Sequence, residues 1–472
     1  MADKNVALMA HLMRRAGFGG TIEEIEARAK KGYEATVEEL LDPEAHGIPP
    51  IDEAVMYRHE PCFEIGGGVP YNSQSHWMYR LINTPRPLEE KMVLFWHHVF
   101  ATGASKLDHC VQMLAQMALF RKFGLSNYKT LLTEVSKNPA MIFWLDNNQN
   151  HKDAPNENWG RELLELFSMG QGNYTEKDVK EASRAFTGWT IAPSFPRNPY
   201  ARFVWEFEYR PEDHDDGEKT FLGHKGRFNG DDIIDIICKQ PATARFVARH
   251  MYNFFVADEV QVPSWLDIPP KDSVAINILA STLLESNWDI KQALRVLFNS
   301  DFFKDEKAWY AKVKSPIELV TSTMRLVGDY RNPKPDVMSI AVEPGYMGQS
   351  LLDPPSVEGW HTGQEWIDSG SLVRRINFVA DRLGDTSLPG VRTIIDRLAT
   401  KDTLTPEELL ESCLYLLGIV RLEEGTRSEL IQHLKAGGPI KRGKTEKERE
   451  AFATRVKEVL QLIAAAREYQ FG

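Results

Sequence analysis

Apolar residues recur every three to four positions along most of this chain, which is the spacing of one face of an amphipathic helix. Residues 87–101 show the pattern plainly, because Leu88, Met92, Phe95 and Val99 share one side of a helical wheel. The same spacing, with its start and stop signals, predicts helices at 4–16, 21–30, 33–42, 72–83, 87–101, 107–123, 127–136, 157–169, 175–187, 230–239, 241–256, 271–286, 289–298, 315–328, 371–382, 390–399, 405–417, 426–435 and 446–468.

Four of these helices begin with a capping box, in which a Ser or Thr side chain and an acidic side chain three positions later satisfy each other's backbone N–H groups. The four boxes begin at Thr21, Thr175, Ser315 and Thr405. Pro316 and Pro406 add a proline at the first helical position, where no N–H is needed.

One segment alternates instead with a period of two. In 203–209 (FVWEFEY) aromatic residues alternate with Val and Glu, which is typical of a half-buried strand. We expect it to pair with 219–223 in a small β-hairpin near 202–223. The predicted fold is therefore mainly α, with a large helical domain over 1–385 that carries this hairpin and a helical C-terminal extension over 386–472.

Composition narrows the function classes. A net charge of −11 argues against a nucleic-acid groove, because phosphate binding needs clustered Lys and Arg. The four cysteines have no CxxC spacing, so neither a zinc knuckle nor a disulfide framework is expected. No apolar run approaches the ~20 residues that span a bilayer. The first arginines follow the short apolar stretch rather than precede it, so we expect no secretory signal and a cytoplasmic protein.

Candidate chemistry concentrates on the helix that follows Pro155. Glu157, Arg161 and Glu165 form an i, i+4 ladder, and Glu162 lies one turn before Glu165 on the same arc. Neighbouring carboxylates suit general acid and base roles, because repulsion raises one pKa while a nearby Arg lowers another. The alternative is an ordinary solvated helix face with salt bridges.

The loop before this helix is rich in oxygen ligands. Asp146, Asn148, Asn150 and Glu157 match positions 1, 3, 5 and 12 of a calcium-binding loop, and hard cations prefer such ligands. The required glycine is replaced by His151. An irregular divalent-cation site and a network of Asx turns both remain open.

Three further clusters are candidates. His97 and His98 lie on an aromatic helix and could serve as a base or a ligand. His214, Asp215 and Lys219 lie on the predicted hairpin connection, typical of an exposed catalytic or metal-binding tip. Trp360 and Trp366 lie on a Pro- and Gly-rich loop, where they could stack against a sugar or pin the loop into the core.

Several blocks, in this order, resemble a bacterial family catalogued as domain of unknown function 1800. They are HLMRRAGFG (11–19), FWHHVFAT (95–102), NPAMIFWLDNNQN (138–150), PNENWGRELLELFSMG (155–170), AFTGW (185–189), HDDGEKTFLGH (214–224), VKSPIEL (313–319) and PPSVEGW (354–360). The likeness covers roughly 1–380. The family usually has FWHNHF, so Val99 stands where relatives carry a second histidine. The resemblance supplies no reaction or cofactor.

We expect the loop and helix at 146–165, His97 and the His214 loop to converge in one site, and three functions follow. The leading hypothesis is a hydrolase or lyase acting on a glycan-like substrate. Its acid/base residues would be Glu162 and Glu165, with Arg161 tuning them. Substrate-binding residues would be Asn156, Asn158, Lys219, Trp360 and Trp366.

The second hypothesis is a metal-dependent oxidoreductase or hydrolase that binds a transition metal through His97, His214 and Glu162. The third is a non-catalytic scaffold that docks a protein partner through its C-terminal helices.

Overall fold

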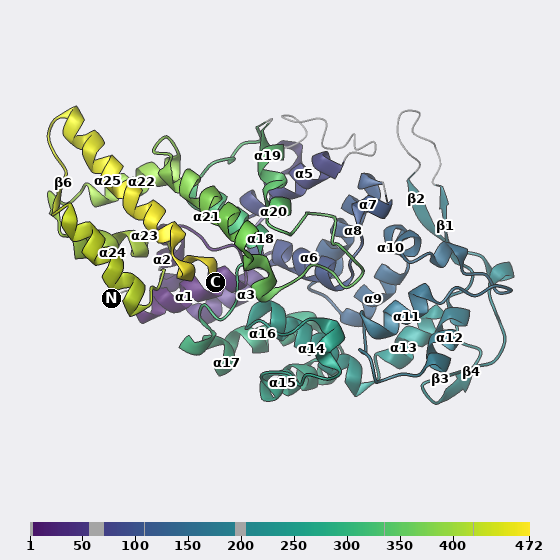
Figure 1. Ribbon diagram of the computed structural model, residues 1–472. Coiled ribbons are helices and arrows are strands. Elements are labelled where there is room, and N and C mark those ends of the chain that lie inside the picture. The colour runs from purple at the N-terminus through teal and green to yellow at the C-terminus, as the bar shows by residue number, and fades with distance from the viewer. Residues whose placement is uncertain (1–2, 56–69, 108, 194–203, 335, 419) are drawn as a thin grey trace.

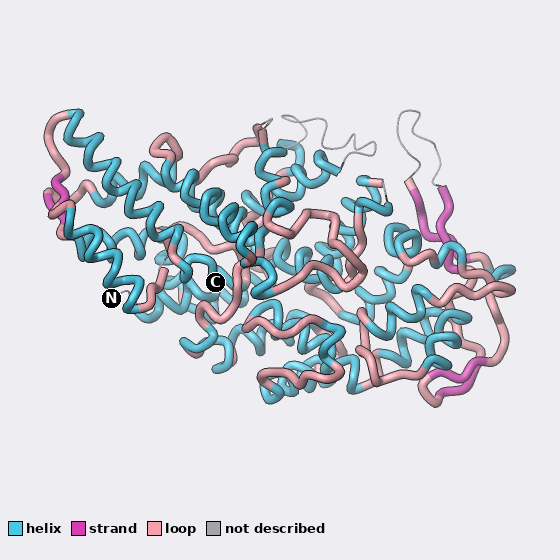
Figure 2. The backbone as a smooth tube through the Cα atoms, in the orientation of Figure 1, coloured by secondary structure: helices cyan, strands magenta, loops and turns pink. Residues whose placement is uncertain are grey.

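A computed structural model describes residues 3–55, 70–107, 109–193, 204–334, 336–418 and 420–472. Helices dominate it and strands are few and short, which confirms the predicted mainly α class (Figure 2). The chain forms an elongated body with α6 (Pro87–Val99) near its middle (Figure 1).

The other helices follow the predicted ranges closely, with short additional helices between them. Those of the first half are α1 (Lys4–Arg15), α2 (Ile22–Lys31), α3 (Tyr33–Leu41), α5 (Pro70–Asn83), α7 (Ala104–Leu107), α8 (Cys110–Phe123), α9 (Tyr128–Ser136), α10 (Pro139–Trp144), α11 (Asn158–Glu165), α12 (Glu176–Ala185), α13 (Gly230–Ile237) and α14 (Pro241–Phe255).

Those of the second half are α15 (Ser273–Glu285), α16 (Ile290–Asn299), α17 (Asp301–Lys304), α18 (Pro316–Val327), α19 (Val337–Ala341), α20 (Glu343–Tyr346), α21 (Ser369–Gly384), α22 (Pro389–Leu398), α23 (Pro406–Leu416), α24 (Glu424–Ala436) and α25 (Glu446–Ala465).

All four predicted capping boxes form. Thr21, Thr175, Ser315 and Thr405 each accept the third-residue N–H, and the acidic side chain there accepts the N-cap N–H in return. Such a cap stabilises a helix by about 1 kcal/mol. Local side-chain chemistry therefore fixes where α2, α12, α18 and α23 begin.

The strands pair differently from the prediction. Strand β2 (Trp205–Tyr209) pairs antiparallel with β1 (Trp189–Pro193), and β3 (Lys219–Phe221) pairs with β4 (His224–Gly226). A third pair joins β5 (Thr403–Leu404) to β6 (Ile440–Lys441). The predicted hairpin of 203–209 with 219–223 is therefore wrong; its residues 202 and 203 lie outside the described residues.

The cause is a two-residue turn. Leu222 and Gly223 both have positive φ (46° and 82°), the conformation of a tight hairpin turn with the twist that β-strands favour. This turn closes β3 onto the residues that immediately follow it. Meanwhile Arg210 N–H donates to Gly188 O (2.8 Å), which holds the end of β2 beside β1.

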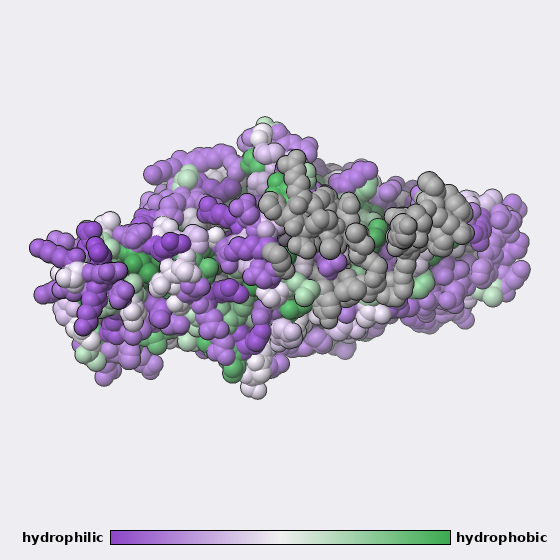
Figure 3. Space-filling model, turned by 90° about the horizontal axis from the view of Figure 1, so that it is seen from above, coloured by the Kyte–Doolittle hydropathy of each residue, from purple (hydrophilic) through white to green (hydrophobic). Residues whose placement is uncertain are grey.

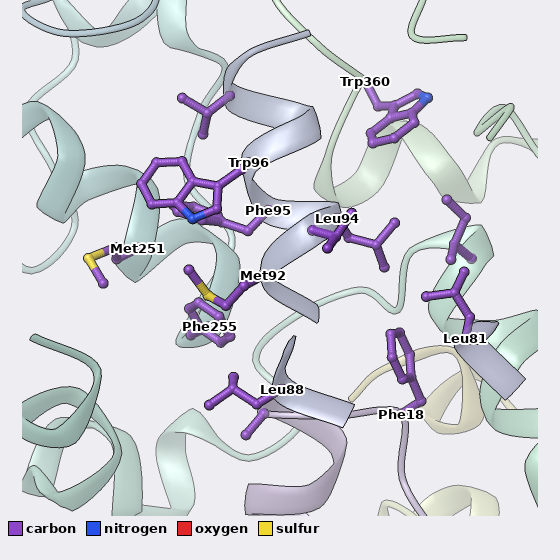
Figure 4. Close-up of a cluster of buried hydrophobic side chains, with 14 of the residues drawn as sticks. Phe18, Leu81, Leu88, Met92, Leu94, Phe95, Trp96, Met251, Phe255 and Trp360 are labelled. Atoms are coloured by element: carbon purple, nitrogen blue, oxygen red, sulfur yellow. The ribbon is translucent and has the colours of Figure 1, made fainter. Parts of the chain in front are cut away.

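Helix α6 lies inside the core rather than on its border. Every residue of it except Glu89 is buried. Leu88, Met92, Phe95 and Trp96 pack toward α14, whereas Leu94 faces the side on which Trp360 lies (Figure 4). Its polar residues must therefore find partners within the protein.

Three ion pairs, made by Glu90 and Lys91, meet this requirement for the charged residues of α6. Glu90 accepts hydrogen bonds from Arg80 Nε (3.0 Å) and Arg121 Nε (2.5 Å). Burial alone would raise the pKa of Glu90, but Arg121 and Arg80 outweigh it and bring the pKa to about 2. Lys91 pairs with Glu318 at the start of α18 and also donates to Gly17 O (3.1 Å).

The C-terminal helices pack against the first helices of the chain. Tyr415 donates a hydrogen bond to Glu26 of α2, and Arg397 forms an ion pair with Glu23 of α2. Near the end of the chain, Phe471 forms an isolated β-bridge with Val313. Figure 1 shows α22 to α25 beside α1 and α2 at one end of the body. One buried apolar cluster runs from Met9 to Tyr469. The division at 385 stays a prediction about folding units.

The described helices include none long and apolar enough to cross a lipid bilayer. The face seen in Figure 3 is largely hydrophilic, with hydrophobic residues in small, separate patches.

The shared core makes a prediction about unfolding. Leu460 of α25 and Leu88 of α6 are both fully buried. Leu460→Ala and Leu88→Ala should each lower the free energy of unfolding by about 2–5 kcal/mol through loss of packing and a residual cavity. Both should shift one thermal transition, followed by calorimetry and near-ultraviolet circular dichroism. A separate early transition in Leu460→Ala alone would mean that 386–472 folds independently.

Candidate functional site

Two carboxylates lie together on α11, and the charge of a third, Glu358 on the loop that follows α20, acts on one of them. Glu162 and Glu165 lie one turn apart on α11, and both are partly buried. Burial, the neighbouring charge of Glu165 and the charge of Glu358 raise the pKa of Glu162 to about 7, against the opposing effect of Arg161. Glu162 is therefore about half protonated at neutral pH. We refer to Glu162, Glu165 and Glu358 as the carboxylate cluster.

The two glutamates of α11 have different partners. Glu165 accepts hydrogen bonds from the Tyr174 hydroxyl (3.1 Å) and from Gln171. Burial and the charge of Glu165 raise the pKa of Tyr174 well above its ordinary value, so Tyr174 stays a hydrogen-bond donor. No hydrogen bond is found for the Glu162 carboxyl group among the described residues. Glu165 is thus held by two hydrogen-bond donors, and Glu162 is poised to exchange a proton.

Arg161 is directed away from this pair. Its guanidinium donates two hydrogen bonds to Glu176 (2.9 and 2.7 Å) and one to Glu157 (3.3 Å). The Glu157–Arg161 part of the predicted ladder therefore forms. Arg161 influences Glu162 through its charge and not through a direct bond.

A series of contacts holds the loop of Glu358 near α11. Asp353 accepts the Ser105 N–H (2.9 Å), and Lys106 donates to both oxygens of Asp146 (3.0 and 3.1 Å). Asn158 Nδ2 donates to Asp146 as well (3.3 Å), one helical turn before Glu162. The side chains around the carboxylate cluster are thus ordered by polar contacts between segments far apart in the sequence.

The loop at 146–157 forms a network of Asx hydrogen bonds. Asn147 Nδ2 donates to Trp189 O (2.8 Å), and Asn150 Nδ2 donates to Ser183 O (2.9 Å). Asn150 Oδ1 accepts the Asn156 N–H (2.9 Å). The Asx network, one of the two alternatives open for this loop, is therefore present.

The four predicted cation ligands are mostly engaged by these and other protein donors. Asp146, at φ 56°, forms an ion pair with Lys106, and Glu157 forms one with Arg161. Asn148 Oδ1 is buried without a partner. A divalent cation at Asp146, Asn148, Asn150 and Glu157 would have to displace Lys106 and stays a prediction.

His97 is enclosed by aromatic rings. It is fully buried, with edge-to-face contacts to Trp77 (5.7 Å between ring centroids) and Trp360 (5.1 Å). Burial and His98 lower the pKa of His97 to about 3, so its ring is neutral at physiological pH. Neither ring nitrogen of His97 has a hydrogen-bond partner in the part of the chain that the structure describes. These are the surroundings of a core histidine.

Trp360 and Trp366 anchor their loop in the core. Both are buried, and Trp360 Nε1 donates to Ser350 O (3.0 Å) while its ring stacks on His98 (interplanar angle 5°). Gly359, at φ 89°, lies so close to α6 that a Cβ atom there would come within 2.4 Å of His98 O. The two tryptophans pin the loop and present no open ring face to a sugar.

The His214 loop is structural rather than an exposed tip. His214 is buried and contacts Thr187 O through Nδ1 (2.9 Å). Asp215 accepts two hydrogen bonds from Arg184 (2.7 and 3.2 Å), and buried Lys219 donates to the carbonyls of Asp215 and Gly217. These side chains fasten β3 to the end of α12.

The expected convergence of His97, Glu162 and Asp215 is not found among the contacts of these three described residues. Figure 1 shows α6, α11 and β3 at successive positions along the body. Within the described ranges no three His, Cys, Asp or Glu side chains are grouped to hold a metal ion, so the predicted His97–His214–Glu162 ligand set is not assembled.

Two polar residues near these groups were missed from the sequence. Glu358 lies within the PPSVEGW block, but nothing local indicated that it would meet α11. His250 of α14 is buried, and its ring centroid lies 6.4 Å from that of His98. No spacing pattern in the sequence marked His250 as a candidate.

Comparison with known proteins decides the family. The family model described as "Protein of unknown function (DUF1800)" matches residues 11–471. The chain belongs to DUF1800. The match extends well past residue 380 and includes the C-terminal helices. No curated protein and no solved structure matches the chain.

One departure of this DUF1800 chain from the expected histidine block has a structural consequence. Val99 is buried in the core, and His98, in the place of the usual Asn, accepts the Trp360 N–H through Nδ1 (3.2 Å). His98 therefore ties α6 to the 353–366 loop.

The raised pKa of Glu162 predicts how stability depends on pH. Because the folded pKa (about 7) exceeds the ordinary value (4.5), the protonated carboxyl stabilises the fold, and this contribution is lost as pH rises through 7. Thermal unfolding from pH 4.5 to 8 should show wild type losing stability relative to Glu162→Gln. Glu358→Gln should shift that loss to lower pH. Parallel curves for wild type and Glu162→Gln would contradict the assignment.

Proposed function

We propose that this DUF1800 protein is an enzyme of acid/base type, a hydrolase or lyase acting on a polyhydroxylated, glycan-like substrate. The observation that supports it most is Glu162, a carboxyl group with a pKa of about 7 beside two other carboxylates. A group that titrates at the working pH can both give and take a proton, which is what general catalysis requires.

The roles follow from the surroundings of each carboxylate. Glu162, partly buried and without a hydrogen-bonded partner among the described residues, would donate a proton to the leaving oxygen. Glu165, held by Tyr174 and Gln171, would act as the base or stabilise developing positive charge. A pair of carboxyl groups in which one serves as the acid is the arrangement that glycoside cleavage uses.

The preference for a hydroxylated substrate rests on the groups near the cluster. Asn158 is exposed at the start of α11, and Asn156 is partly exposed beside it. Amide and carboxylate groups recognise hydroxyls by hydrogen bonding from both donors and acceptors. Asn156 and Asn158 thus remain proposed substrate contacts, whereas Trp360, Trp366 and Lys219 are occupied in the core.

The alternatives have less support. A metal-dependent reaction would need ligands that the described residues do not group together. A scaffold docking through the C-terminal helices would need apolar surface there. In the described part of 386–472 no large hydrophobic residue is strongly exposed; those that are lie elsewhere, as Val274 and Ile278 on α15 do.

Substitution at Glu162 tests the proposal. Purified protein would be incubated with soluble neutral and acidic polysaccharides. Hydrolysis would be followed by new reducing ends and elimination by ultraviolet absorbance of the unsaturated product. Glu162→Gln should reduce the rate by about 10²–10⁴-fold, since it removes the transferable proton. The wild-type rate should fall above pH 7.

The matched control is Glu176→Gln, because Glu176 is an exposed glutamate that also pairs with Arg161. It should keep nearly full activity. Equal loss in both variants, or wild-type activity in Glu162→Gln on a substrate that the protein cleaves, would refute the assigned role.

A further inference from the structure

A small cavity lies between α6, α14, the start of α18 and the 349–366 loop. Its volume is about 20 Å³, and its walls include Glu318 and six buried residues, His98, His250, Asn253, Lys312, Gln349 and Trp366. A cavity with so many polar residues in its wall is unusual, since empty cavities are normally apolar.

The hydrogen-bonding state of His98 is defined by the backbone. Its Nδ1 accepts the Trp360 N–H (3.2 Å), so Nδ1 carries no proton. Burial and the charge of Lys312 lower the pKa of His98 to about 4, which leaves the ring neutral. The single ring proton is therefore on Nε2, and His98 is a hydrogen-bond donor there.

The remaining capacity of the other wall residues is also to donate. Trp366 Nε1–H, which can only donate, has no partner among the described residues. Asn253 Oδ1 accepts the Glu259 N–H (2.9 Å), and Gln349 Oε1 accepts the Ile317 N–H (3.0 Å). The amide oxygens are thus in use, and the amide NH₂ groups are the ends left to donate.

The charges around the cavity point the same way. Lys312 pairs with Asp258 (2.7 Å) and Lys91 with Glu318. Arg15, also buried, interacts with both carboxylates but hydrogen-bonds only to the carbonyls of Val256 and Ala308. Three cations therefore face two carboxylates, which leaves a net charge of +1. Buried charge is costly unless an opposite charge compensates it.

We propose that this cavity binds a carboxylate group, which would accept hydrogen bonds from His98 and Trp366 and balance the excess positive charge. The cavity is close to the size that holds one water molecule, so the oxygens of a carboxylate group can enter it and a sugar ring cannot. The ligand is therefore a small free carboxylic acid, or the acid group of a larger molecule after the 353–366 loop opens. Carboxylate binding here is independent of acid/base chemistry at Glu162.

The indole N–H of Trp366 provides a direct measurement. In ¹⁵N-labelled full-length protein, the Trp366 resonance is identified as the one absent from Trp366→Phe. Acetate should move this resonance, and acetamide, of similar shape but neutral, should not. Trp366→Phe should weaken acetate binding, measured by calorimetry, by roughly ten- to hundredfold, as expected for loss of one hydrogen bond to a charged group. Glucuronate and glucose, added in parallel, distinguish a sugar acid from a free small acid.

Matched variants separate binding from folding. Trp265→Phe should bind acetate as wild type does, because its N–H already donates to Val260 O (2.7 Å) and it lies outside the cavity. Lys312→Met removes the excess positive charge and should abolish binding while the other indole resonances stay in place, whereas Lys312→Met with Asp258→Asn leaves the net charge at +1 and should bind acetate more tightly than Lys312→Met alone. Glu162→Gln should bind acetate normally.

No response of the Trp366 resonance to acetate would overturn the proposal. An equal response to acetamide, or full acetate binding by Lys312→Met, would overturn it as well.

Discussion

The complete burial of α6 is the constraint on which the rest of the structure depends. A helix inside the core cannot leave a charged side chain unpaired, because an isolated charge in a low-dielectric interior is very costly. Glu90 therefore recruits Arg80 and Arg121 from α5 and α8, and Lys91 recruits Glu318 from α18. These pairs fix the helices around α6 in one arrangement, since sliding any of them would separate a buried charge from its partner.

The same constraint explains the position of the two polar sites. His98 is on α6, and its bond to the Trp360 N–H brings the 353–366 loop onto the helix. From this loop the charge of Glu358 acts on Glu162 of α11, and Trp360 and Trp366 form part of the cavity wall. His98, a buried residue of the core, thus positions the loop that supplies residues to both polar sites.

Local signals in the sequence were sufficient for the helices and insufficient for the contacts between them. Capping boxes act within one turn, so Thr21 and Ser315 marked helix starts correctly. Strand pairing failed because it depended on the conformation of Leu222 and Gly223, which the alternation of 203–209 does not contain. Glu162 and Glu165 were identified as a pair, but the effect of Glu358 depends on the charge of a residue from a distant segment. For Trp360 both substrate stacking and pinning into the core were open, because the composition of its loop does not reveal the hydrogen bond to His98.

Gly359 gives this arrangement a single vulnerable position. Its backbone has φ 89° and approaches His98 so closely that there is no space for a β-carbon. A methyl group there would push the loop outward, separating Glu358 from Glu162 and opening the roof of the cavity at the same time. The distance between the 353–366 loop and α6 therefore couples two chemically unrelated sites, the carboxylate cluster and the cavity. A substitution that moves the loop away from α6 would change both sites, although they have no side chain in common.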